Sequence, residues 1–133
     1  MKILLILTAL FEGLVGVGLF LMPVLVVSTL LNTPLDTPGG LVAARLAGAA
    51  IIALAICCWQ ARDSQPTRAA LGIVAALLFY NIAAAALLAY GGVRLGLQSI
   101  FIWPTIVAHS GMAIWCAALV WLAFRKEQAA TAK

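Results

Sequence analysis

Residues 40–61, GLVAARLAGAAIIALAICCWQA, form an uninterrupted apolar run in which Arg45 is the one charged residue. An α-helix rises about 1.5 Å per residue, so roughly 20 apolar residues cross the hydrocarbon core of a bilayer, which is about 30 Å thick. The run has the required length and composition. It therefore predicts a helix that spans a membrane.

Three further runs of the same kind lie at about residues 3–22, 67–90 and 100–124. The stretches between them, residues 32–40, 62–66 and 91–96, are rich in glycine, proline and polar residues, which favour turns. The sequence therefore predicts an all-α protein: a four-helix transmembrane bundle in one domain, residues 1–124, with a polar, frayed tail at 125–133. Residues 24–31, which follow Pro23, form either a short separate helix at the membrane interface or the kinked end of the first span.

The composition agrees with a protein whose surface faces lipid. Of its 133 residues, 65% are hydrophobic and only 9% are charged, whereas soluble domains carry roughly 25% charged residues. The net charge of +4 comes from basic residues scattered singly at the ends of the runs, a pattern that does not indicate a nucleic-acid partner. The three cysteines form neither a disulfide framework nor a zinc motif.

The distribution of basic residues predicts the orientation. In a four-span arrangement one side holds only Arg94, balanced by Asp36. Because basic residues are enriched in cytoplasmic loops, both termini are expected in the cytoplasm. The first run contains Glu12 and no obvious cleavage site, so we interpret it as an uncleaved span rather than a secretory signal. The basic residues of the other side are Lys2, Arg62, Arg68, Arg125, Lys126 and Lys133.

Each span carries one strongly polar residue within its apolar run: Glu12, Arg45, Asn81 and His109. A charge at mid-bilayer costs at least about 2.5–3.5 kcal/mol, so such residues face the bundle interior and find partners. Helical rise places Arg45, Asn81 and His109 at one level and Glu12 somewhat lower. We therefore expect a Glu12–Arg45 pair and an Asn81–His109 contact.

Two aromatic residues, Tyr80 and Trp103, are expected to line the same polar region. Pro104 removes a backbone hydrogen bond and is expected to kink or open the fourth span. The cluster has three interpretations. It fixes helix register, it binds a ligand, proton or redox cofactor, or it contacts a partner subunit.

Small residues supply the expected helix contacts, because they let backbones approach closely in lipid. The first span has Gly13, Gly16 and Gly18, and the second has small pairs at 43/47 and 44/48. The third has alanines at 83–86. These faces predict a tightly packed bundle or a surface for other membrane subunits. A homodimer is also among the expectations, because four short helices leave a large lipid-facing surface.

The chain resembles the DoxX-like group of small four-helix bacterial membrane proteins. The matching features are Leu21-Met22-Pro23 after a glycine-rich span, Arg45 to Gly48 in the second span, Tyr80-Asn81, and Trp103-Pro104 to His109. The resemblance spans most of the chain and implies the bacterial inner membrane. The name-giving member of the group is associated with thiosulfate oxidation coupled to quinone. The resemblance assigns no functional residue.

Small multidrug transporters are similar in another way, since they too are short four-helix proteins with a glutamate inside the first span. Glu12 stands in a comparable place, but an Arg45 that neutralised it would argue against cation transport. No nucleophile–base pair, paired carboxylates or phosphate loop indicates catalysis. The sequence thus favours an accessory subunit or a binder of a lipid-soluble molecule such as a quinone. The alternative is a proton-coupled carrier that uses Glu12, and no metal ligand set or cofactor is assigned.

Overall fold

The computed structural model describes residues 1–65 and 67–131, so Pro66 and Lys133, which entered the loop and charge predictions, lie outside the described residues. The described chain is all-α, as predicted. Four of its helices are long and apolar enough to cross a membrane: α1, α3, α4 and α5. The helices are α1 (Lys2–Leu21), α2 (Pro23–Leu31), α3 (Pro38–Ala61), α4 (Arg68–Arg94) and α5 (Ile102–Thr131).

Pro23 starts a separate helix, which decides between the two interpretations of residues 24–31. Proline has no amide hydrogen and disfavours helical backbone at the residue before it. Accordingly Met22 leaves the helical region, with φ −131° and ψ 54°, and α2 begins at Pro23. The helix ends at Leu31, and the next residue, Asn32, has a left-handed φ of 50°, a conformation that asparagine tolerates.

Threonine side chains fix the starts of α3 and α4. The hydroxyl of Thr37 accepts a hydrogen bond from the backbone N–H of Gly40 at 3.1 Å. The hydroxyl of Thr67 accepts one from Ala70 at 3.2 Å. Such N-caps satisfy amides that have no partner within the helix. They place the starts of both helices close to the predicted ones.

Two helices extend beyond their predicted ends, α4 because side chains pack against its glycines and α5 because its tail has high helix propensity. The predicted break at Gly91-Gly92 lies inside α4, and the chain turns only beyond Arg94, where Gly96 adopts a φ of +69°. The tail was expected to fray, yet α5 continues to Thr131. The tail residues are mostly good helix formers, and the Thr131 hydroxyl bonds the carbonyl oxygens of Glu127 and Gln128.

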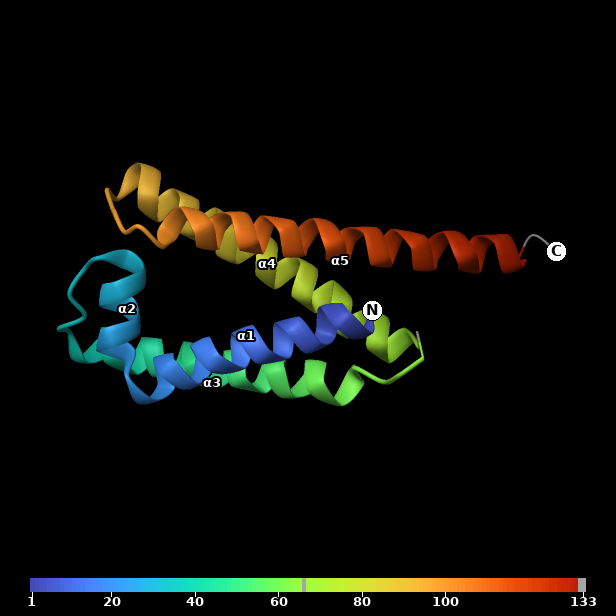
Figure 1. Cartoon of the computed structure of the whole chain (residues 1–133), viewed down its shortest axis with the longest axis horizontal. Helices are drawn as coiled ribbons and strands as arrows, with labels where there is room; N and C mark the ends of the chain where they lie inside the picture. The colour runs from blue at the N-terminus through green and yellow to red at the C-terminus, as the bar shows by residue number, and fades with distance from the viewer. Residues whose placement is uncertain (66, 132–133) are drawn as a thin grey trace.

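The bundle consists of two antiparallel helix pairs. Helix α1 packs along α3 and α4 packs along α5, while the two pairs share far fewer contacts. The pairs meet at the end that carries the N-terminus and separate toward the other end, where α2 stands across the molecule (Figure 1). The C-terminal end of α5 lies at the same end of the molecule as the N-terminus (Figure 1).

The apolar core lies where the two pairs meet. Its buried side chains come from all four long helices. Each of them contributes only a few core residues, and most large apolar side chains remain on the outside, as expected of a protein surrounded by lipid. The core residues are Leu4, Leu5, Ala9, Cys58, Ala61, Val74, Leu77 and Cys116.

An ion pair joins the ends of α1 and α3 at this side of the molecule. The Nζ atom of Lys2 lies 2.6 Å from Oδ1 of Asp63. The hydrogen bond from Lys2 lowers the pKa of the Asp63 carboxyl. The pair therefore stabilises the fold at neutral pH and is lost as the pH falls through that lowered pKa. Both side chains are exposed, so the contribution is small.

Glycines bring α1 and α3 into backbone contact, as the small-residue pattern predicted. A Cβ atom added at Gly48 would lie 2.6 Å from the backbone nitrogen of Phe20 and 2.8 Å from the carbonyl oxygen of Gly16. Those atoms belong to the backbone of α1 and have no freedom to move aside. The closest approach of the pair thus requires a glycine at position 48.

We predict that Gly48→Ala lowers the free energy of unfolding by about 1–3 kcal/mol, because an extra methyl group overpacks this contact. Gly72→Ala is the matched control, since a Cβ atom there meets nothing within 4 Å. Thermal unfolding in detergent, followed by circular dichroism, measures both. Equal melting temperatures for the two variants would contradict the contact.

Candidate functional site

The buried polar residues lie next to the core, in the interior of the molecule. Glu12 is midway along α1 and Asn81 is midway along α4. Only 9% of Glu12 and 2% of Asn81 is exposed. Tyr80 and His109 are half-buried beside them. We call these four residues, Glu12, Tyr80, Asn81 and His109, the polar cluster.

One half of the polar cluster joins the two helix pairs. The hydroxyl of Tyr80 donates a hydrogen bond to Oε2 of Glu12 at 2.8 Å. Among the described residues, Tyr80 is the only hydrogen-bond partner of this carboxyl, and no cationic side chain lies within ion-pair distance. Glu12 is therefore held by a neutral donor rather than by a counter-charge.

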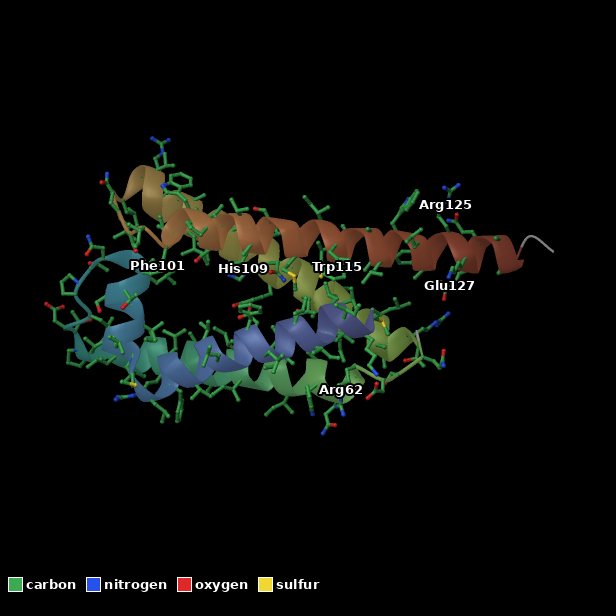
Figure 2. The ribbon with its side chains drawn as sticks, viewed as in Figure 1. Arg62, Phe101, His109, Trp115, Arg125 and Glu127 are labelled. Atoms are coloured by element: carbon green, nitrogen blue, oxygen red, sulfur yellow. The ribbon has the colours of Figure 1, made fainter. Side chains whose placement is uncertain are left out.

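The other half joins α4 to α5. The Nδ1 atom of His109 lies 2.8 Å from Oδ1 of Asn81, as the shared depth of the two residues predicted. Figure 2 shows His109 on the side of α5 that faces the α1–α3 pair. The rings of His109 and Tyr80 touch edge to face, with centroids 5.7 Å apart and planes at 82°. This ring contact makes the two halves one continuous cluster.

The hydrogen bonds determine which ring nitrogen of His109 is protonated. The side-chain NH₂ of Asn81 donates to the carbonyl oxygen of Leu77 at 2.8 Å, and a carbonyl oxygen can only accept. Oδ1 of Asn81 therefore faces His109, and Nδ1 must carry the hydrogen. In the neutral ring Nε2 is then an acceptor, and no described residue bonds to it.

A further polar group lies one helical turn from Glu12. Thr8 is 2% exposed, and its hydroxyl has no hydrogen-bond partner in the described part of the chain. An unpaired buried polar group costs about 1–3 kcal/mol. The interior face of α1 thus carries more hydrogen-bonding capacity than the neighbouring helices use.

Arg45 does not pair with Glu12, and this expectation was wrong. Gly13 lies against Ala55, and Gly16 lies against Gly48 and Ile52. In this antiparallel register Arg45 is level with Met22, about ten residues from Glu12 along α1, which corresponds to roughly 15 Å. Arg45 is instead exposed and lines a groove with Met22. The part of the sequence argument against a Glu12 carrier that relied on this pair, the neutralisation of Glu12 by Arg45, is thereby removed.

Trp103 and Pro104 also lie outside the polar cluster. Trp103 is 55% exposed at the start of α5, and its ring lies near Gly92. Pro104 belongs to the first turn of α5, where the missing amide hydrogen has no helical partner to lose, so it does not open the helix. The described residues hold no group of three histidine, cysteine or acidic side chains placed to bind a metal ion.

Two surface grooves among the described residues lie away from the polar cluster, and neither is lined by one of its residues. One, of about 570 Å³, lies between α2 and α3 and includes Arg45. The other, of about 360 Å³, lies between α4 and α5 and includes Arg68 and Glu127. The second groove is near the end of α5 that carries Arg125 and Glu127 (Figure 2).

Comparison of the chain with protein-family models, curated proteins and solved structures finds no match.

The protonation of His109 is directly testable, because the chain has a single histidine. We expect the ¹⁵N NMR spectrum of His109 at neutral pH to show a protonated Nδ1 and an unprotonated Nε2. Asn81→Leu removes the acceptor that selects this tautomer, so the preference should be lost. A spectrum with protonated Nε2 in the unaltered protein would contradict the assigned hydrogen bond.

Proposed function

We propose that this protein binds a lipid-soluble molecule of the quinone and quinol class at the polar cluster. Such a molecule carries oxygen atoms attached to its ring. The observation that carries the proposal is the pairing of His109 with Asn81, which leaves Nε2 as an acceptor on a half-buried ring. A quinol hydroxyl is a donor of matching chemistry. The resemblance to DoxX-like proteins points in the same direction.

The surroundings of His109 suit a flat ring. The faces of Tyr80 and His109 stand nearly perpendicular to each other and offer edge and face contacts to an aromatic guest. Glu12 and Thr8 supply polar groups beside them. Apolar side chains surround the cluster, which favours a guest that arrives from the membrane.

The test is to separate the ligand contact of His109 from its contact with Asn81. His109→Asn keeps an N–H near the position of Nδ1 and removes Nε2. Loss of one hydrogen bond, about 0.5–1.5 kcal/mol, should weaken binding of a short-chain ubiquinol analogue roughly two- to twelvefold. Quenching of tryptophan fluorescence in lipid nanodiscs measures the affinity. Ser110→Ala is the matched control, since Ser110 is exposed beside His109.

Equal affinity of His109→Asn and the unaltered protein for the quinol analogue would contradict the proposed contact between His109 and the quinol. A proton flux into liposomes that disappears in Glu12→Gln, without quinol binding, would favour the carrier instead. That alternative is supported by the absence of a cationic partner for Glu12 among the described residues. If the protein is isolated with a second protein at fixed stoichiometry, that result would instead support an accessory subunit of a membrane complex.

We also propose that the chain is a multi-pass protein of the bacterial inner membrane with both termini in the cytoplasm. The end of the molecule where the α3–α4 loop lies carries four basic residues, Lys2, Arg62, Arg68 and Arg125. Cytoplasmic loops are enriched in such residues. Figure 2 shows Arg62 and Arg125 at this end.

A reporter enzyme that is active only outside the cytoplasm tests this orientation. Fused after residue 133, it should be inactive, and inserted between Asp36 and Thr37 it should be active. The reverse pattern would invert the proposed orientation.

A further inference from the structure

The groove between α2 and α3 lies at the end of the molecule opposite the termini. It forms where α2 turns away from α1 at Pro23 and stands across the helix pairs (Figure 1). Its walls are apolar except at two places, Ser28 and Arg45. Its apolar walls include Leu21, Val24, Leu25 and Leu41.

Arg45 brings a positive charge to this groove without a partner in the described part of the chain. Arg62, by contrast, pairs with Asp63 and covers the ring of Trp59. Arg125 covers the ring of Trp121. No described hydrogen bond, ion pair or aromatic contact holds Arg45, and no acidic residue lines the groove.

The depth of Arg45 favours an anionic partner at the membrane interface. It lies seven residues after Pro38, roughly 10 Å along α3. An arginine so placed within a span reaches toward the headgroup region, where anionic lipid headgroups attract basic side chains. Its planar guanidinium binds phosphate oxygens with two parallel hydrogen bonds.

We propose that this groove binds one anionic phospholipid, with its phosphate on Arg45 and an acyl chain along Leu21, Val24 and Leu41. The hydroxyl hydrogen of Ser28 is taken by the carbonyl oxygen of Leu25 at 3.1 Å. The Ser28 oxygen therefore offers an acceptor, which suits a hydroxylated headgroup such as that of phosphatidylglycerol.

A lipid fits the groove better than a free inorganic anion. The groove has a volume of about 570 Å³, and its walls are apolar beyond Ser28 and Arg45. A small hydrated anion would leave these walls uncovered. A lipid covers the apolar walls with its acyl chain and neutralises the charge of Arg45 with its phosphate. The proposed lipid site is independent of the polar cluster, since the two share no residue.

The test uses protein in nanodiscs of equimolar phosphatidylglycerol and phosphatidylcholine, with retained lipids counted by native mass spectrometry. The unaltered protein should keep one phosphatidylglycerol in about fivefold preference over phosphatidylcholine, because one arginine contributes about this factor. Arg45→Gln should abolish the preference. The matched control, Arg94→Gln, removes an exposed arginine from the same end of the molecule and should retain it.

Any of four results would overturn the lipid site. Arg45→Gln could keep the full preference, or both variants could lose it equally, which would indicate general charge attraction. Displacement of the bound mass by added inorganic phosphate would identify a free anion as the occupant. A second copy of this chain, lost in Arg45→Gln, would identify a dimer contact. Circular dichroism of both variants checks that they remain helical.

Discussion

The hydrogen bond from Tyr80 to Glu12 is the interaction on which the interior of this molecule depends. A carboxyl group at membrane depth requires a partner, because the surrounding lipid offers none. The partner comes from the opposite helix pair. The two pairs share few contacts elsewhere, so this bond and the small core beside it hold them in one relation. The ring of Tyr80 also touches His109, and the bond thereby places the second half of the polar cluster.

The fold was largely predictable because membrane helices obey simple constraints of length and polarity. The run at 40–61 and its three counterparts correspond to α3, α1, α4 and α5. Pro23 restricts its own backbone, which is why a helix start there was among the expectations. The ends of α4 and α5 were less predictable. Whether glycines such as Gly91 break a helix depends on what packs against them, here the side chain of Leu97. The local sequence does not predict that packing.

The polar site was predictable only in part, for a reason that lies in helix register. Asn81 and His109 were placed at one level by counting residues, and α4 and α5 indeed bring them together. Counting also suggested that Arg45 reaches Glu12. That failed because the glycine contact between Gly16 and Gly48 sets the offset of α1 against α3. The role of Tyr80 as the partner of Glu12 had no sequence signal beyond its position next to Asn81.

Helix α5 has a mechanical consequence. It runs without interruption from Ile102 to Thr131, a rod of about 45 Å, longer than the roughly 30 Å hydrocarbon core. Its last turns therefore project beyond the apolar layer or tilt the rod, and they carry Arg125 and Glu127 at their surface (Figure 2). A continuous helix resists twisting, so a torque applied at this charged end is passed along α5 to the turn that carries His109, whose ring bonds to Asn81 of α4. The charged end of α5 is thus mechanically coupled to the polar cluster through His109.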